Sequence, residues 1–205
     1  NVGLPEIDEQ EMMIRAVKAV QSVCDLPLQL DSTRADVLEA GLRVYNGKPI
    51  VNSVNGEQAV LDRLLPICKK YGAAVVGLTL DENGIPALAE QRFALAQKIV
   101  AAAEAAGIPR EDVYIDCLTL TASAQQEAVR ETLKAVRMVK ERLGVKTVLG
   151  VSNISFGLPQ RENINAAFFT MAMQNGLSAA IMNPGSQGMM KAYYSYCALS
   201  GVDKQ

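Results

Sequence analysis

The chain of 205 residues carries a formal net charge of -2 and contains 49% hydrophobic and 20% charged residues, which is typical of one soluble globular domain spanning residues 1–205. Its lysines and arginines are scattered and give no excess of positive charge, which argues against nucleic acid or an anionic membrane surface as a partner. No apolar stretch is long enough to span a bilayer and the first ten residues lack the pattern of a signal peptide, so we expect a cytoplasmic protein.

Strand-like and helix-like segments alternate along the chain. Short apolar runs predict strands, and longer amphipathic segments that end at glycine or asparagine predict helices. The expected strands are 26–30, 49–51, 73–80, 113–115, 147–151 and 179–182, and the expected helices are 6–23, 34–45, 57–71, 87–106, 125–143, 163–175 and 187–199. Because a helix closely follows each strand, the pattern predicts an α/β fold with parallel strands and the helices outside them.

Polar residues follow the expected strands. They are Asp31, Asn52, residues 79–81, Asp116, Asn153 and Asn183. In a (β/α)8 barrel, the carboxyl ends of the strands lie on one rim, and in a doubly wound sheet they lie along one edge. We expect these side chains to gather there in either fold. The chain has no GxGxxG motif, and the spacing in 41–48 does not fit a phosphate-binding loop, which favours the barrel.

The chemistry available at the strand ends is that of carboxylates and amides. The chain contains no histidine, which excludes Ser-His-Asp and Cys-His mechanisms. Its four cysteines are far apart, so we expect reduced thiols and neither a disulfide framework nor a metal site. A carboxylate accepts from two adjacent N–H groups, and an amide donates and accepts in one plane. These groups suit a flat, uncharged heterocycle that carries an amide and an amino group.

Several of these residues also have a purely structural explanation. Asp31 could cap the helix that follows it, and an asparagine after a strand, such as Asn153, is commonly a turn residue. Asp116 directly follows an apolar strand, where a carboxylate is unfavourable unless it is hydrogen-bonded, and is therefore the stronger functional candidate. Three hydroxyl residues near strand ends are predicted to be turn or cap residues: Ser53, Thr119 and Ser155.

Family motifs occur in order along the chain: LQLDST, IVNSVNGE, AAVVGLTLDENGIP, VYIDCLTL, TVLGVSNISFGLPQRENIN and GLSAAIMNP. Together they resemble the pterin-binding methyltransferases, which are the methyltetrahydrofolate:corrinoid-protein methyltransferases and the folate domain of cobalamin-dependent methionine synthase. The resemblance implies a (β/α)8 TIM barrel of the dihydropteroate synthase-like type. Six strands cannot close an eight-stranded barrel. We therefore expect the first one to two strands in about 60 to 75 further residues upstream.

The resemblance also implies roles for the strand-end residues. The pterin ring is expected to bind Asp31, Asn52 and Asp116, with Asn153 near N5, the atom that carries the methyl group. Phe156 stands where some relatives have a glutamine in the polar network around N5. Further residues are carried over more weakly: Asn1, Ser53, Ser152, Arg161, Asn165 and Asn183. Of these, Arg161 and Asn165 stand where the family has loop residues near the mouth of the active site.

The function that the resemblance implies is transfer of a methyl group between N5 of tetrahydrofolate and the cobalt of a corrinoid, in either direction. The chain lacks the Asp-x-His-x-x-Gly segment of cobalamin modules, so the corrinoid is expected on a partner protein or domain that docks on the strand-end rim. We also expect a homodimer. One alternative is a non-catalytic folate-binding subunit. Another is a dihydropteroate synthase, although that family shows Ser-Arg-Lys where this chain has Ser152, Asn153 and Ile154.

Overall fold

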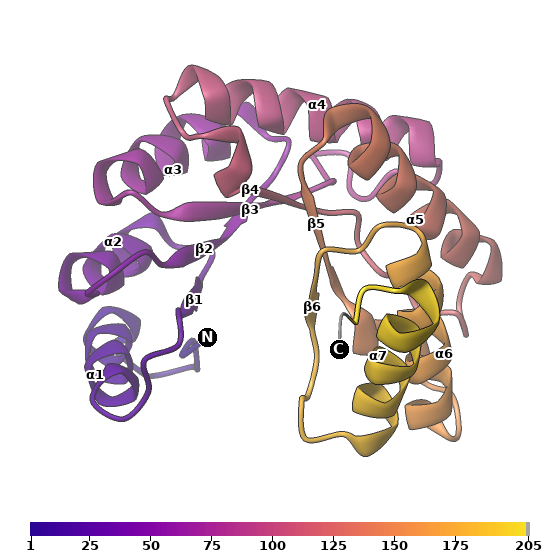
Figure 1. The fold of residues 1–205 in the computed structure, drawn as a ribbon. Coiled ribbons are helices and arrows are strands. Elements are labelled where there is room, and N and C mark those ends of the chain that lie inside the picture. Colours follow the sequence, from indigo (N-terminus) through magenta and orange to yellow (C-terminus); the bar gives the residue numbers. More distant parts are fainter. Residues whose placement is uncertain (204–205) are drawn as a thin grey trace. The chain divides into compact units, whose positions relative to one another are not determined.

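The computed structural model describes residues 1–203, in which strands and helices alternate as predicted (Figure 1). The strands are β1 (Gln29–Asp31), β2 (Ile50–Val54), β3 (Ala74–Leu78), β4 (Val113–Asp116), β5 (Lys146–Gly150) and β6 (Ala179–Ile181). The α-helices are α1 (Glu9–Gln21), α2 (Ala35–Val44), α3 (Gln58–Tyr71), α4 (Ala89–Ala105), α5 (Gln126–Met138), α6 (Arg161–Gln174) and α7 (Gln187–Ser200). Three short helical turns are η1 (Arg110–Asp112), η2 (Val139–Leu143) and η3 (Val151–Ser155). The strand order in the sheet is the order of the sequence.

Local sequence sets the ends of several helices. The Asp8 carboxylate accepts a hydrogen bond from the backbone N–H of Gln10, so α1 begins at a side-chain N-cap. Helix α3 ends at Gly72, whose φ of 64° lies in the left-handed region that favours glycine. The helix expected over 125–143 is divided, because α5 ends at Met138 and the π-helical turn η2 follows it.

The first of two compact units comprises residues 1–82 and 95–114. Strands β1, β2 and β3 pair in parallel, and helices α1, α2 and α3 lie along one side of them (Figure 1). The core of this unit consists of buried aliphatic side chains, among them Leu38, Val51 and Leu64. The apolar run predicted a strand that ends before Asn52. Strand β2 instead continues to Val54, so Asn52 lies inside the strand.

The second unit comprises residues 83–94 and the chain from 115 onward. Strands β5 and β6 pair in parallel, and α5, α6 and α7 lie on one side of them (Figure 1). Helix α6 packs against both α7 and η3. Buried side chains such as Ile115, Val136 and Leu149 form the core. The packing of α6 on η3 matters for the site, because η3 follows β5 and carries Asn153.

The four cysteines are free thiols, as predicted. Cys68 and Cys117 are buried, whereas Cys24 and Cys197 are half-buried. Burial raises the pKa of the Cys68 thiol to about 12, which keeps it protonated and unreactive at neutral pH. Within residues 1–203, no helix combines the length and the hydrophobicity that crossing a membrane requires.

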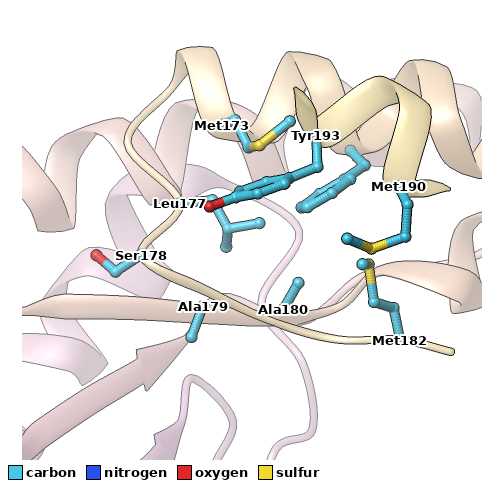
Figure 2. Close-up of a pocket in the computed structure, with 9 residues that line it drawn as sticks. Met173, Leu177, Ser178, Ala179, Ala180, Met182, Met190 and Tyr193 are labelled. Atoms are coloured by element: carbon cyan, nitrogen blue, oxygen red, sulfur yellow. The ribbon is translucent and has the colours of Figure 1, made fainter. Parts of the chain in front are cut away.

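A cavity of about 250 Å³ lies between β6 and the helices α6 and α7. Figure 2 shows Met173 and Tyr193 from these helices on one side and Ala179 and Ala180 of β6 on the other. The lining is mostly apolar and contains no carboxylate or amide side chain. This space is therefore a gap in helix–sheet packing.

Candidate functional site

Asp31 and Asn52 are neighbours across the first unit's sheet. They pair in register at the carboxyl ends of β1 and β2, where adjacent strands lie about 4.8 Å apart, and in-register side chains share one face. Both residues are partly exposed. Among the described residues, neither side chain has a hydrogen bond or ion pair. A carboxylate and an amide thus stand side by side without an internal partner.

The alternative that Asp31 caps the following helix is wrong. Helix α2 has Arg34 at its N-cap position and no side-chain cap. The hydroxyl of Ser32 accepts a hydrogen bond from the Arg34 N–H at 3.2 Å and donates one to the Glu9 carboxylate at 2.7 Å. Ser32 therefore organises this turn, which leaves the Asp31 carboxylate available for a ligand.

Three of the weaker candidates have local structural roles or lie within a strand: Asn1, Ser53 and Asn183. The side chain of Asn1 accepts a hydrogen bond from the Gly3 N–H at 3.0 Å, and Asn183 accepts one from the Gly185 N–H at 2.9 Å. Both amides therefore act in local turns. Ser53 is half-buried in β2, where the register with β3 shifts between Asn52 and Val54.

Asp116 is the last residue of β4 and is only 7% exposed. Burial raises the pKa of this carboxyl group to about 7, and the hydrogen bond from the Leu118 N–H, 2.7 Å from Oδ1, acts in the opposite direction. The carboxyl group is therefore poised between its neutral and charged forms near neutral pH. A ligand that donates hydrogen bonds to it favours the charged form.

The strand end that carries Asp116 is held by Arg92, a fully buried arginine of α4. Its Nη1 group donates to the carbonyl oxygens of Cys117 and Leu118 at 2.9 and 3.1 Å and to the Thr132 hydroxyl at 2.8 Å. Leu118 has a φ of 62°, a strained value for a side-chain-bearing residue. In this conformation its N–H turns back to Asp116.

Arg92 positions the backbone next to a candidate site residue, and the sequence interpretation missed it. Burial lowers the pKa of its guanidinium group, and within residues 1–203 its Nη2 atom has no hydrogen-bond partner. Burying a cation costs desolvation free energy, which the hydrogen bonds of Arg92 to the loop after β4 offset in part. The sequence holds no clear signal for this role, because Arg92 follows Glu90 and Gln91 in a helix where an exposed arginine is expected.

Asn153 lies on the 3-10 turn η3, and this turn is a feature that the simple picture of a strand end did not predict. Val151, Ile154 and Ser155 are buried and anchor the turn, whereas Asn153 is exposed. In the described part of the chain, its side-chain amide makes no hydrogen bond. A Cβ atom at Gly150 would lie 3.1 Å from the Asn153 Nδ2 atom, so the glycine leaves room for the amide.

Arg161 holds η3 from the first position of α6. Its Nε donates to the Ser155 hydroxyl at 2.9 Å and its Nη2 donates to the Ser152 carbonyl oxygen at 3.1 Å. Its guanidinium carbon lies 4.5 Å from the centre of the Phe156 ring. The prediction that Ser155 is a turn hydroxyl is confirmed, because its Oγ also donates to the Ser152 carbonyl oxygen at 3.3 Å.

Arg161 lies in helix α6 and not in the loop expected before it, whereas Asn165 lies in the helix, as the expected range 163–175 predicts. Helix α6 begins at Arg161, two residues earlier than predicted, because this side chain finds its partners in the turn before the helix. Asn165 is buried within α6, and its Oδ1 atom has no hydrogen-bond partner in the described structure. Arg161 therefore positions the turn that carries Asn153.

A second cavity, of about 370 Å³, lies beside Asn153. It is lined by Thr119, Leu120, Thr121, Ala124, Gln125, Asn153 and Phe156. Thr119 is 8% exposed, and across residues 1–203 its Oγ1 atom has no hydrogen-bond partner. The prediction that Thr119 is a turn or cap hydroxyl is therefore wrong. An unpaired buried hydroxyl costs about 1–3 kcal/mol.

Comparison with known proteins places the chain in a family. The profile of the pterin binding enzymes matches residues 3–183. The chain belongs to the pterin-binding enzyme family. It is 31% identical over 203 residues to a methylcorrinoid:tetrahydrofolate methyltransferase of Eubacterium limosum, covering 98% of this chain and 74% of that protein.

Methionine synthases are also similar, over a small part of their length. The methionine synthase of Mycobacterium leprae is 37% identical over 175 residues, which cover 79% of this chain and 14% of that protein. The methionine synthase of Mycobacterium tuberculosis is 36% identical over 171 residues, which cover 77% of this chain and 14% of that protein. The matched region thus spans about a seventh of each of these relatives.

Solved structures identify the fold. A Yersinia pestis dihydropteroate synthase with a pterine-sulfa conjugate superposes with a TM-score of 0.74 at 15% identity, covering 98% of this chain and 81% of that one. A Coxiella burnetii dihydropteroate synthase in complex with pteroic acid gives a TM-score of 0.74 at 15% identity, covering 99% and 78%. The prediction of a dihydropteroate synthase-like TIM-barrel fold is confirmed, and the doubly wound alternative is wrong.

Proposed function

We propose that this chain is a methyltransferase that moves a methyl group between N5 of tetrahydrofolate and the cobalt of a corrinoid protein. The observation that carries the proposal is the Asn153 amide, which is exposed, unpaired among the described residues and fixed on a turn held by Arg161. The names of the relatives support the same chemistry. They leave the direction of transfer open, because one relative is named for the methylcorrinoid as the donor.

The pterin ring is recognised by hydrogen bonds to its amide and amino edge. In this proposal Asp31, Asn52 and Asp116 bind the pterin ring, as the family resemblance implies. The ring carries an N–H and an amino group on adjacent positions, and a carboxylate can accept from both. Asp116 is suited to this role because burial raises the pKa of its carboxyl group to about 7, so hydrogen bonds donated by the ring favour its charged form.

Asn153 assists the reaction at N5. An amine is a poor leaving group, so N5 becomes protonated as its bond to the methyl carbon breaks. The Oδ1 atom of Asn153 accepts a hydrogen bond from the N5 proton and thereby stabilises the protonated state as it develops. An amide cannot supply that proton, so solvent delivers it. The corrinoid supplies the cobalt centre that accepts or donates the methyl group.

We infer that the corrinoid arrives on a partner protein or domain that docks over the carboxyl ends of the strands. Asn153 is exposed, so a methyl group held beside it faces outward. Among residues 1–203, no three cysteine, aspartate or glutamate side chains converge where they could hold a metal ion. The expected homodimer and cytoplasmic location stay predictions.

The test is methyl transfer by the full chain. The protein is mixed anaerobically with 5-methyltetrahydrofolate and cob(I)alamin, and the loss of the cob(I)alamin absorbance is followed. The reverse reaction is assayed with methylcobalamin and tetrahydrofolate. Transfer in either direction supports the proposal. Folate binding without transfer, even with a corrinoid protein as the partner, favours a non-catalytic folate-binding subunit. Condensation of a hydroxymethyl-dihydropterin diphosphate with p-aminobenzoate indicates a dihydropteroate synthase instead.

A further inference from the structure

A fully buried arginine, Arg92 of α4, is held by hydrogen bonds on two sides of its guanidinium group. Its Nε donates to the Pro86 carbonyl oxygen at 2.8 Å, in the segment that precedes its own helix. Its Nη1 donates to the carbonyl oxygens of Cys117 and Leu118 in the loop after β4. Because the Nε bond orients the planar group, the arginine places a rigid donor against this loop.

Leu118 is the residue on which this donor acts. Its carbonyl oxygen accepts from Arg92 Nη1 at 3.1 Å and from the Thr132 hydroxyl of α5 at 3.0 Å. Its φ of 62° lies in the left-handed region, which a side-chain-bearing residue keeps only when its surroundings hold it there. In this conformation the Leu118 N–H donates to Asp116 Oδ1 at 2.7 Å. Side chains from two helices therefore hold the residue whose N–H binds the Asp116 carboxyl group.

The hydrogen bond from the Leu118 N–H acts on the charge of Asp116. Burial raises the pKa of this carboxyl group to about 7, and the N–H opposes burial because it favours the charged form. Among the described residues, three other ionisable groups act on this part of the second unit: the Cys117 thiol, the Arg92 guanidinium and the Glu131 carboxylate. Burial raises the pKa of the Cys117 thiol well above its usual range, the guanidinium stays charged, and Glu131 accepts a hydrogen bond from the start of α4. The charge of Asp116 near pH 7 therefore depends on whether the Leu118 N–H stays in place.

We propose that Arg92 is a positioning residue for ligand binding: by fixing the conformation of Leu118, it keeps the Asp116 carboxylate hydrogen-bonded and ready to accept from a pterin. The pterin as the ligand rests on the proposed function, whereas the link from Arg92 to Asp116 rests on the geometry of the protein alone. Without the guanidinium, Leu118 relaxes to the favoured region of negative φ, which turns its N–H away from the carboxyl group. Burial then acts unopposed, and Asp116 keeps its proton to a higher pH.

The first test follows the Asp116 carboxyl group directly and without a ligand. The full chain is prepared with aspartate isotopically labelled at the carboxyl carbon, and NMR spectra are recorded from about pH 4 to about pH 9. Comparison with Asp116→Asn identifies the signal. We expect Arg92→Met to raise the titration midpoint by about one pH unit, and Thr132→Val to raise it less, because the second substitution keeps the arginine. An unchanged or lower midpoint in the folded variants overturns the inference.

Matched variants separate a change in ionisation from a loss of structure. Thr132→Ser retains the hydroxyl and should keep the midpoint of the unaltered chain. Thr170→Val makes the same replacement as Thr132→Val but in α6, where the hydroxyl donates to the Ala166 carbonyl oxygen, and should not move the midpoint. Circular dichroism establishes that each variant is folded. If Arg92→Met does not fold, the comparison of Thr132→Val with Thr132→Ser decides the outcome.

The second test looks for the same shift in ligand binding. The affinity for 5-methyltetrahydrofolate is measured by titration calorimetry at about pH 7 and at about pH 9. Arg92→Met should weaken it about fivefold at the lower pH and less than about twofold at the higher pH, where Asp116 is charged in both proteins. An equal loss at both pH values indicates a merely structural effect and overturns the inference. If the NMR midpoint moves but the unaltered chain binds no folate, the proposed function fails and the link between Arg92 and Asp116 stands.

Discussion

The Nη1 atom of Arg92 lies 2.9 Å from the carbonyl oxygen of Cys117, so a fully buried cation holds the residue that follows Asp116. The same nitrogen also contacts the Leu118 carbonyl oxygen, and the Leu118 N–H in turn contacts the Asp116 carboxyl group. Helix α4 thereby fixes the conformation of a candidate ligand-binding residue through the backbone.

Replacing Arg92 by methionine should destabilise the protein by roughly 2–4 kcal/mol. The substitution removes the Arg92 donor to the buried Cys117 carbonyl oxygen and leaves the Leu118 carbonyl oxygen with the Thr132 hydroxyl as its remaining side-chain donor. Urea unfolding followed by circular dichroism measures the change. The matched control is Arg15→Met, because Arg15 is 69% exposed and its pair with Glu11 is long, at 4.0 Å. That control should shift stability by less than about 0.5 kcal/mol. Equal effects of the two substitutions contradict the role of Arg92.

Folate affinity should rise with pH through the titration of Asp116. The pKa of this carboxyl group is raised to about 7, and hydrogen bonds from the pterin favour its charged form. Affinity should therefore be low at pH 6 and approach its maximum above pH 8. Asp116→Asn should weaken binding roughly 10- to 100-fold and flatten this dependence. The control Asp62→Asn, in the exposed part of α3, should retain the unaltered profile.

The same carboxyl group should make the folded protein less stable as pH rises. Its pKa is higher in the folded chain than in the unfolded one, so between about pH 4 and 7 the folded state binds more protons. Stability from this group is complete below the unfolded pKa and is lost as the pH rises through the folded pKa. Asp116→Asn should therefore raise the melting temperature at pH 8 relative to the unaltered chain. A lower melting temperature at that pH contradicts the assignment.

Asn153→Ala should lower the methyl-transfer rate about 100-fold while changing the folate dissociation constant less than about threefold. The reason is that the amide contacts a proton that N5 acquires only as the reaction proceeds. Single-turnover absorbance measurements give the rate, and calorimetry gives the affinity. Asn163→Ala, at an exposed position of α6, should change neither quantity. Parallel losses in rate and affinity for Asn153→Ala exclude a role confined to the transition state.

Gly150→Ala should slow methyl transfer about tenfold, because the new methyl group presses on the amide of Asn153 at 3.1 Å. The backbone at Gly150 has a φ of -73° and a ψ of 83°, which an alanine can adopt, so the effect comes from the side chain. The rate is measured as for Asn153→Ala. A variant that is folded and transfers methyl groups at the normal rate shows that the amide tolerates displacement. Gly144→Ala is not a suitable control, since its φ of 67° adds strain.

Much of the fold is readable from the sequence. The alternation of apolar runs with amphipathic segments predicts the order of strands and helices, because each element has its own periodicity. The ends of helices and strands are harder to predict, since they depend on hydrogen-bond partners outside the element. Strand β2 continues past Asn52 because it is paired with β3, and α6 begins at Arg161 because that side chain bonds to Ser155 and Ser152.

The sequence indicates candidate site residues that have an unusual local setting, but not residues that position them through the backbone. Asp116 stands out because burying a carboxylate after an apolar strand is unfavourable unless the carboxylate is hydrogen-bonded. Arg92 and Thr119 gave no such signal, since an arginine in a helix and a threonine after a strand are ordinary until their burial is known. Burial is a property of the folded chain, produced by contacts between distant segments, and no short motif records it.

The hydrogen bonds of Arg161 to η3 couple the position of the first turn of α6 to the position of Asn153. One side chain links the start of this helix to the Ser152 carbonyl oxygen and the Ser155 hydroxyl, on either side of Asn153. A shift of the helix start is therefore transmitted to the amide without any contact at the amide itself. Under the proposed function, a substitution in the first turn of α6 should therefore change the rate of methyl transfer more than the affinity for the pterin.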